Sequence, residues 1–270
     1  MKRVALLGCG YIGTQLALAV DSGRIPARLE RVYDASEEAA RVLVSKLDSK
    51  PQITENPHLL SYPPVDIVAE AASQGAVREV ALSVLQNRRD LMVMSVGAFM
   101  DEAVREVLEE ACVDYQARIY LPSGAAGGLD AISAARREIE HISITTTKNP
   151  ASLRGAPHFE MEGMDADSIT ERTILYSGGA AEAVRRFPAN ANVAGAVSMA
   201  AGREAEVVVV ADPDTKSNTH TIRVRGGFGS MEFKTNNVPE PSNPRTSRLA
   251  ALSAVRTLYN YCAGGVKTGS

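Results

Sequence analysis

Short apolar runs alternate with amphipathic segments over residues 2–121 of the chain. The apolar runs predict buried strands, and the segments between them carry apolar residues at helical spacing. Strand and helix alternating at this pace are typical of βαβ units with right-handed crossovers, which build a mainly parallel sheet. The expected strands are 2–8, 28–34, 65–71, 91–95 and 117–121, and the expected helices are 11–22, 36–47, 75–86 and 101–112.

From Ile139 onward the pattern changes to alternating, Thr-rich runs with fewer helices between them. Gly226 and Gly227 separate two of these runs, as a tight antiparallel turn requires. This region therefore predicts an α+β domain with a largely antiparallel sheet. The expected strands are 141–148, 204–212, 219–226 and 229–235, and the expected helices are 180–186 and 192–201.

The two patterns predict an α/β protein of two domains. We expect a doubly wound parallel sheet in residues 1–122 and the second domain in residues 123–243. An amphipathic pattern over residues 246–259 predicts a last helix, and the prolines at 239, 241 and 244 prevent an earlier start. We expect the segment 244–262 to pack back on the first domain.

Composition excludes several classes of function. The 270 residues include 29 basic and 32 acidic side chains, so no net positive charge favours nucleic acid or an anionic membrane. The three cysteines are widely spaced and form no C-x-x-C, which argues against a disulfide framework or a zinc site. We expect no metal and a reducing, cytoplasmic setting. No apolar run approaches the roughly 20 residues that span a bilayer.

The first strand is followed by a G-x-G-x-x-G sequence, residues 8–13. Between a strand and a helix, such glycines allow a tight turn, a close backbone approach to a pyrophosphate and close helix packing. Asp34 ends the second strand, 21 positions after Gly13 (34 − 13), where a carboxylate can bind ribose hydroxyls. We therefore expect a Rossmann-type dinucleotide site. Its expected members are Gly8, Gly10, Tyr11, Ile12, Gly13 and Asp34.

The Asp34 carboxylate would repel a 2′-phosphate, so NAD is favoured as the cofactor. Arg31 and Ser36 lie close by in the sequence and leave NADP possible. Open parallel sheets bind ligands at the carboxyl ends of their strands, where residues 70–74 and 95–98 are mostly small. These two segments either contact the cofactor or are ordinary turns. The cofactor contacts expected there are Ala71, Ser73, Ser95 and Gly97.

Four later segments are recognisable. Residues 122–132 (PSGAAGGLDAI), 187–194 (FPANANVA), 217–222 (SNTHTI) and 243–247 (NPRTS) resemble segments of the L-aspartate dehydrogenase family. Together with the glycine motif, they follow the order of that family over nearly the whole chain. The resemblance implies NAD(P)-dependent oxidative deamination of L-aspartate, through iminosuccinate, to oxaloacetate and ammonia. It also implies the reverse amination, and in some relatives iminosuccinate could feed NAD biosynthesis.

The resemblance also implies roles for single residues. By motif, His220 is the catalytic residue, and Ala126 and Asn192 contact the cofactor. Asn190 is a close neighbour whose role the motif does not separate from that of Asn192. The chain departs from the family at Thr147, where we expect a second basic residue. The contacts to the substrate carboxylates therefore stay open.

The reaction needs a group that moves a proton at the substrate nitrogen or at an attacking water, and histidine suits that task near neutral pH. His58 and His158 lie beside prolines in expected loops, where solvation is the simple expectation. His141 begins a strand, which suits a structural role. His220 lies inside an alternating strand, so it either faces a cleft or is a half-buried structural histidine.

A dicarboxylate substrate also needs cationic or polar donors. Lys148, Arg245 and Asn190 are the candidates, and Arg245 could grip a carboxylate with two hydrogen bonds. Both cations could equally be surface charges. We expect a small-molecule substrate and a homodimer formed through the β-rich second domain. Two alternatives stay open: a dehydrogenase or reductase of the homoserine dehydrogenase or dihydrodipicolinate reductase type, and a nicotinamide-binding sensor without turnover.

Overall fold

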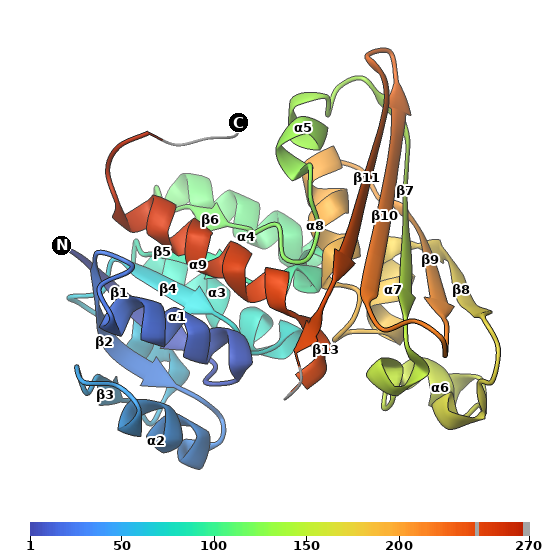
Figure 1. Ribbon diagram of the computed structural model, residues 1–270. Coiled ribbons are helices and arrows are strands. Elements are labelled where there is room, and N and C mark those ends of the chain that lie inside the picture. The colour runs from blue at the N-terminus through green and yellow to red at the C-terminus, as the bar shows by residue number, and fades with distance from the viewer. Residues whose placement is uncertain (241–242, 267–270) are drawn as a thin grey trace. The chain divides into compact units, whose positions relative to one another are not determined.

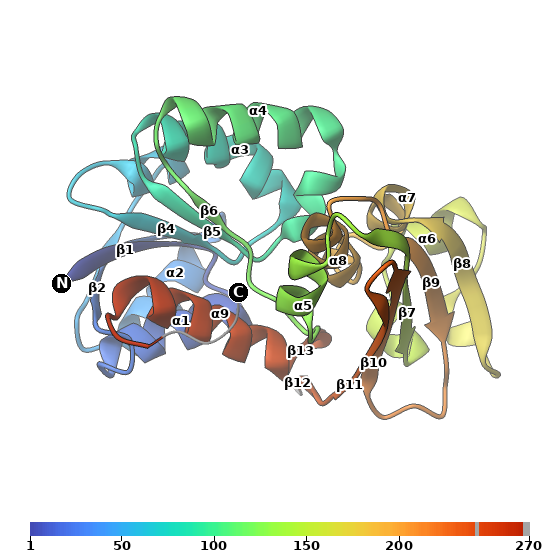
Figure 2. The same ribbon diagram turned by 90° about the horizontal axis from the view of Figure 1, so that it is seen from above.

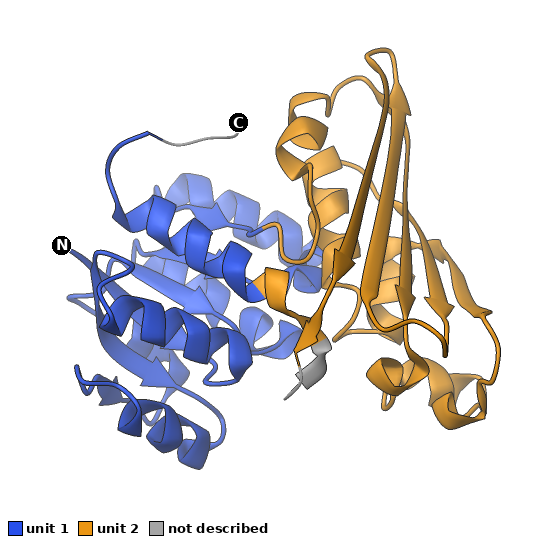
Figure 3. Ribbon diagram, viewed as in Figure 1, with its two compact units in different colours: residues 1–122, 251–267 blue, residues 123–250, 268–270 orange. Residues whose placement is uncertain are grey.

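The computed structural model describes residues 1–240 and 243–266, with the side chains of residues 243–245 left out (Figure 1). The chain divides into two compact units (Figure 3). Unit 1 contains Met1–Pro122 together with residues 251–266, and unit 2 contains Ser123–Ala250. Unit 1 is therefore built from two separate parts of the sequence.

Unit 1 contains a six-stranded parallel sheet in the order β3-β2-β1-β4-β5-β6. Helices α3 and α4 cover one face of this sheet, and α1, α2 and α9 cover the other (Figure 2). Strand order reverses between β1 and β4, which is where doubly wound sheets bind their ligands. The strands are β1 (Lys2–Leu7), β2 (Ala27–Tyr33), β3 (Gln52–Ile53), β4 (Ile67–Glu70), β5 (Asp90–Val93) and β6 (Ile119–Tyr120). The helices are α1 (Tyr11–Asp21), α2 (Glu37–Ser45), α3 (Gln74–Gln86), α4 (Glu102–Asp114) and α9 (Arg248–Cys262).

Side-chain caps explain where three helices of unit 1 begin. Ser36 accepts a hydrogen bond from the backbone N–H of Ala39 at the start of α2, as the sequence predicts for this N-cap. Ser73 and Asp101 cap α3 and α4 in the same way. Such caps satisfy backbone donors that the first helical turn leaves without a partner.

Most of helix α9 belongs to unit 1, although it lies more than 120 residues after the rest of that unit in the sequence. The Tyr261 ring packs edge-on against Tyr120, with ring centroids 5.3 Å apart, and the Lys2 ammonium lies 5.0 Å from the Tyr261 ring. Leu258 on the same helix is fully buried. The last helix is therefore part of the core that covers one face of the parallel sheet.

Unit 2 contains a five-stranded sheet in the order β11-β10-β7-β9-β8. Only the β7–β9 pair is parallel, so the sheet is mixed but mainly antiparallel. Helices α5, α7 and α8 lie on one face of it (Figure 1). The strands are β7 (Ile139–Lys148), β8 (Thr173–Gly179), β9 (Glu206–Ala211), β10 (Asn218–Gly226) and β11 (Gly229–Asn237). The helices are α5 (Leu129–Ala134), α6 (Pro157–Met161), α7 (Ala180–Arg186) and α8 (Asn192–Ala201).

The fold departs from the sequence prediction at the last helix. Thr246 and Ser247 were expected to be helical, but they belong to strand β13 (Asn243–Ser247). This strand pairs with β12 (Pro239–Glu240), so residues 243–247 are extended and α9 begins only at Arg248. No helix in the described ranges is both long and apolar enough to cross a membrane.

Candidate functional site

A cleft of about 500 Å³ opens in unit 1 at the carboxyl ends of β1, β2 and β4. It is lined by five of the residues that the sequence assigns to the dinucleotide site, namely Gly8, Gly10, Asp34, Ala71 and Ser73. The remaining lining comes from Leu7, Tyr33, Ala35, Pro57, Ala72, Gly75, Ala76, Glu79 and Val80. Sequence reasoning missed Glu79, although it lies four residues after Gly75 on α3 and therefore on the same helical face.

The three motif glycines differ in what surrounds them. Gly8 has a φ of +98°, and a Cβ there would lie 2.6 Å from the carbonyl oxygen of Ala71. A Cβ on Gly13 would lie 2.0 Å from the carbonyl oxygen of Gly8. Gly10 has nothing within 4 Å of the same position. Gly8 and Gly13 are thus required by packing, whereas Gly10 leaves open space at the cleft.

Helix α1 begins directly after Gly10, and no side chain caps its first turn. Its backbone N–H groups and the positive end of its dipole therefore suit an anion. The space beside Gly10 and the uncapped start of α1 suit a pyrophosphate. The nearby Asp34 carboxylate suits the hydroxyls of a ribose. The residues of the cleft fit a dinucleotide cofactor.

The Asp34 carboxylate is held at the cleft by two backbone donors. Its Oδ2 accepts from the N–H of Cys9 at 2.7 Å, and its Oδ1 accepts from the N–H of Ser36 at 2.9 Å. Arg31 lies elsewhere, because its guanidinium donates to backbone carbonyls that include those of Tyr62 and Pro63. Arg31 does not line the cleft.

The other expected cofactor contacts do not line this cleft. Tyr11, Ile12 and Gly13 lie in the first turn of α1, where Gly13 packs against the carbonyl group of Gly8. Ser95 and Gly97 are buried beyond the end of β5, where Gly97 lies in a short 3₁₀ helix (Val96–Met100). The cleft therefore brings together only part of the predicted site.

Unit 2 contains a buried group of polar side chains at the ends of β7 and β10. His220 pairs with Thr146 in the β7–β10 register, and its Nδ1 lies 3.0 Å from the threonine Oγ1. Lys148, two residues beyond Thr146 and on the same face, donates from Nζ to Oδ1 of Asn190 at 2.7 Å. His220 is 2% exposed and Lys148 is 3% exposed. We name Thr146, Lys148, Asn190 and His220 the polar cluster.

Burial and charge fix the protonation of this cluster. Burial, together with the nearby Lys148 charge, lowers the pKa of His220 to about 3. Burial also lowers the pKa of Lys148 to about 8. At neutral pH the His220 imidazole is therefore uncharged, and it is a weak base until nearby negative charges raise its pKa toward the working pH.

The loop that contains Ala126 is fixed to strand β11. The carbonyl oxygen of Ala125 accepts from Thr235 Oγ1 at 2.9 Å and from Asn237 Nδ2 at 3.0 Å. Gly128 has a φ of +78°, and a Cβ there would meet the Phe233 ring at 2.4 Å. The glycine-rich segment thus folds against β11, with Ala126 itself buried.

Asn192 is the first residue of α8 and is half-buried. The Arg245 backbone lies in β13, but its side chain lies outside the described part of the structure, so its expected contact to substrate stays a prediction. Among the described residues, no three His, Cys, Asp or Glu side chains gather as a metal site would need.

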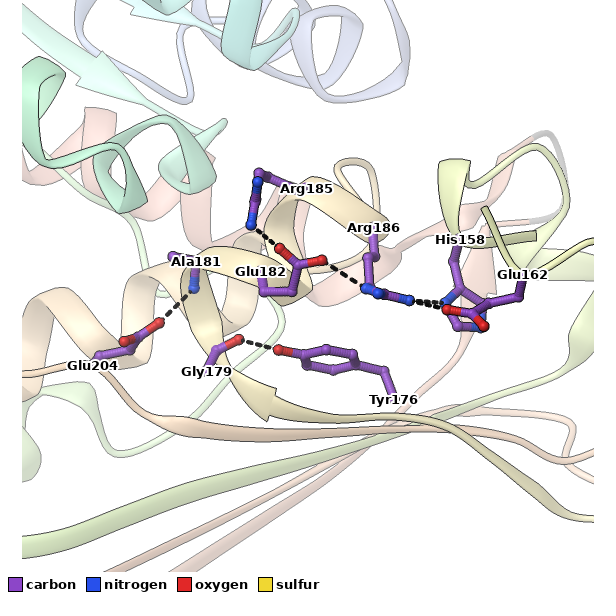
Figure 4. A network of polar contacts seen from close by, with 9 residues as sticks. All are labelled: His158, Glu162, Tyr176, Gly179, Ala181, Glu182, Arg185, Arg186 and Glu204. Atoms are coloured by element: carbon purple, nitrogen blue, oxygen red, sulfur yellow. Dashed lines mark hydrogen bonds and ion pairs between the residues drawn. The ribbon is translucent and has the colours of Figure 1, made fainter. Parts of the chain in front are cut away.

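Figure 4 shows a network of polar contacts around Arg186, a residue that shortly precedes Asn190 in the chain. The Arg186 guanidinium binds the carboxylates of Glu182 and Glu162, and its Nη1 lies 3.2 Å from His158 Nδ1. The His158 ring stacks on Phe187 with centroids 4.7 Å apart. The carbonyl oxygen of Phe187 in turn accepts from the N–H of Asn190 at 2.9 Å.

This network contradicts the expectation that His158 is solvated. His158 lies in α6 and is 2% exposed, because Phe187 and Arg186, about 30 positions later in the chain, pack against it. Burial, with the adjacent Arg186 charge, lowers the pKa of His158. His58 is also half-buried, with Nδ1 2.9 Å from Ser83 Oγ, while His141 is half-exposed beside Glu206.

Comparisons with known proteins cover both units. Residues 130–261 match the family model described as aspartate dehydrogenase, C-terminal. Residues 8–122 match the model described as homoserine dehydrogenase, NAD binding domain. The chain is 54% identical to L-aspartate dehydrogenase from Nitrosopumilus maritimus, with all of both chains covered. It is 44% identical to L-aspartate dehydrogenase from Methanocella arvoryzae, with 97% of each chain covered.

One solved structure agrees with these matches. The crystal structure of aspartate dehydrogenase from Thermotoga maritima superposes with a TM-score of 0.75 at 30% identity, covering 99% of this chain and 100% of that one. A relative that is 54% identical over the full length leaves no part of the chain outside the match. The chain belongs to the L-aspartate dehydrogenase family.

Proposed function

We propose that the protein is an NAD(P)-dependent L-aspartate dehydrogenase. L-Aspartate loses a hydride from its α-carbon and a proton from its nitrogen, which leaves iminosuccinate. Water then adds to the C=N bond and ammonia leaves, which gives oxaloacetate; the reverse sequence aminates oxaloacetate. Membership of the family and the chemistry of the polar cluster support this proposal.

The observation that carries the proposal is the buried, uncharged His220 held by Thr146. If the threonine oxygen accepts from Nδ1–H, the lone pair lies on Nε2, where it can receive a proton from the substrate ammonium or from the attacking water. The imidazolium can then return that proton in the reverse direction. His220 is the acid–base residue of this scheme, and the nicotinamide supplies the hydride acceptor when it is bound.

The two carboxylates of aspartate are assigned to cationic and amide donors. Lys148 is already fixed by Asn190, so its ammonium can bind a carboxylate without losing much side-chain freedom. Arg245 is the candidate for the second carboxylate. Two negative charges near His220 would also raise its pKa from its low value, which moves the base toward the working pH.

For the cofactor we propose NAD, with NADP as a weaker substitute. Two acidic residues, Asp34 and Glu79, line the cleft, and both would repel a 2′-phosphate. Arg31, the cation that could have offset them, is bound to backbone carbonyls. We also propose cofactor contacts by the remaining predicted residues, namely Tyr11, Ile12, Ser95, Gly97, Ala126 and Asn192.

We further propose a homodimer. The sheet face of unit 2 that faces away from α5, α7 and α8 carries small side chains at its centre, where Thr145 pairs with both Thr221 and Val208. A second copy of this face would cover them, as isologous interfaces do. Sedimentation equilibrium tests this: a single species at the monomer mass, across micromolar concentrations, contradicts it.

The test of the activity is a panel assay. Reduction of NAD⁺ and of NADP⁺ is followed at alkaline pH with L-aspartate, D-aspartate, L-glutamate and L-homoserine. We expect turnover with L-aspartate and a higher kcat/KM for NAD⁺ than for NADP⁺. If the protein oxidised L-homoserine in preference to L-aspartate, it would be a dehydrogenase of the homoserine dehydrogenase type. Tight NADH binding without turnover of any of these substrates would identify a sensor.

A further inference from the structure

Glu70, the last residue of β4, is a fully buried carboxylate with four hydrogen bonds. It is 0% exposed. Its Oε1 accepts from the N–H of Ala72 at 2.8 Å and from Oγ of Ser95 at 2.7 Å. Its Oε2 accepts from the N–H groups of Met94 and Ser95, both at 3.0 Å. Every donor comes from a loop that follows a parallel strand.

These hydrogen bonds join two separate loops. Ala72 belongs to the loop after β4, and Met94 and Ser95 belong to the loop after β5. Ala72 lines the dinucleotide cleft, as do its two neighbours in the chain. The paired residues end at Glu70 and Val93, and beyond them each loop has one backbone hydrogen bond to the sheet, from the N–H of Ala71 to Leu7 and from the N–H of Met94 to the carbonyl oxygen of Glu70.

The loop after β4 also supports the glycine turn. A Cβ on Gly8 would lie 2.7 Å from the backbone carbon of Ala71 and 2.8 Å from the nitrogen of Ala72. The N–H of Ala71 donates to the carbonyl oxygen of Leu7 at 2.8 Å. A shift of this loop would therefore move the turn on which a pyrophosphate would lie.

Only a carboxylate fits this position. Its two oxygens accept from all four donors at once, whereas an amide of the same shape would turn its NH₂ group either toward the N–H groups of Met94 and Ser95 or toward the N–H of Ala72. Burial raises the pKa of Glu70, and the hydrogen bonds from Ser95, Ala72 and Met94 act in the opposite direction. Burying a carboxylate is costly, so its place between the loop that lines the cleft and the loop after β5 calls for a functional explanation.

We propose that Glu70 is a positioning residue for the cofactor, whose carboxylate holds the loops after β4 and β5 in the geometry that receives a dinucleotide. The inference rests on the proposed function only in its choice of ligand. It does not depend on the identity of the amino-acid substrate.

The test compares Glu70→Gln and Ser95→Ala with Glu106→Gln, an exposed position on α4 that serves as the matched control. NADH affinity is measured by fluorescence energy transfer without substrate, and KM for L-aspartate is measured at saturating cofactor. We expect the NADH Kd of Glu70→Gln to rise at least about tenfold, that of Ser95→Ala to rise about threefold, and the control to match wild type. KM for L-aspartate should stay within about twofold.

The outcomes separate positioning from a purely structural role. A lower unfolding temperature in Glu70→Gln with unchanged NADH affinity would overturn the proposal. If Glu70→Gln does not fold, Ser95→Ala compared with Ser95→Thr decides, because both change a proposed cofactor contact but only Ser95→Ala removes the hydroxyl that donates to Glu70. An unchanged NADH Kd in Ser95→Ala would then overturn it. Wild-type protein that binds NADH but does not oxidise L-aspartate would reject the proposed function and leave this test intact.

Discussion

Thr146 and His220 face each other across the antiparallel pair β7–β10, and the threonine Oγ1 lies 3.0 Å from the histidine Nδ1. The strand register therefore sets the orientation of the imidazole ring. Because side chains alternate along a strand, a slip of one residue would turn His220 to the opposite face of the sheet. The position of the candidate base is thus a property of the whole sheet and not of one loop.

Replacing His220 tests its catalytic role most directly. We expect His220→Ala to lower kcat by at least about 100-fold, which is the usual contribution of a general acid–base residue. NADH affinity, measured by calorimetry, should not change. His141→Ala is the matched control, because this histidine lies on β7 but is half-exposed. Near-normal turnover in His220→Ala would remove the residue from the mechanism.

Thr146 should affect catalysis by orienting the His220 ring. Thr146→Val keeps the shape of the side chain but removes the oxygen that faces Nδ1, so the ring loses one orienting contact. We expect kcat to fall about tenfold, in line with the loss of one buried hydrogen bond. Thr145→Val, the neighbouring position that points to the other face, should leave steady-state kinetics as they are. Equal effects of the two substitutions would contradict this account.

Acid stability provides a further test of His220. Burial lowers the pKa of His220 from its ordinary value near 6.5 to about 3, so the folded state holds the ring uncharged while the unfolded state protonates it below 6.5. Stability from this group is complete above pH 6.5 and is lost as the pH falls toward 3, with a slope on the order of 1.4 kcal/mol per pH unit.

Urea unfolding of wild type and His220→Gln at several pH values measures this slope. The glutamine variant should lose stability less steeply between pH 6.5 and 3, by about one proton. His158 contributes in the same direction in both proteins, since its pKa is also lowered. Parallel pH profiles would show that His220 is not a buried neutral base.

Substitutions at two motif glycines should have different effects, on cofactor binding at Gly10 and on folding stability at Gly13. Gly10→Ala places a methyl group in open space at the cleft, so the fold should persist while NADH affinity falls roughly tenfold. Gly13→Ala places its methyl group against the Gly8 carbonyl and should destabilise unit 1 by about 1–3 kcal/mol. Thermal unfolding and NADH titration of both variants check this; a destabilised Gly10→Ala protein would place that glycine in the packing.

Cofactor preference should depend on Asp34. Asp34→Ser removes a carboxylate from the cleft but keeps a small acceptor for the neighbouring backbone donors. We expect the ratio of kcat/KM for NADP⁺ to that for NAD⁺ to rise at least about tenfold, as the loss of a charged hydrogen bond implies. A ratio that does not move would assign the discrimination to another residue.

Much of the fold could be predicted from the sequence because its pattern is strong. The strand and helix periods place α7 and α8 at the predicted bounds and most other elements within a few residues. Strand β8 was missed because its sequence, TILYSGG, shows no clean alternation of apolar and polar residues. The helices α5 and α6 are too short for a helical period to be visible.

The site was less predictable, since its contacts join distant parts of the chain. The role of Glu70 depends on residues 24 and 25 positions later, and nothing near it in the sequence indicates that contact. His158 stands beside a proline, which indicates a loop, yet its burial comes from residues 28 and 29 positions later. Local patterns locate strand ends, but they do not show which side chains meet there.

Helix α9 places a constraint on how the protein forms in the cell. Tyr261 packs against Tyr120, and Lys2 lies over the same ring, so residues far apart in the sequence meet in unit 1. All residues through α9 must therefore be synthesised before unit 1 can close its core. Until then the face of the parallel sheet that α9 covers stays exposed to water.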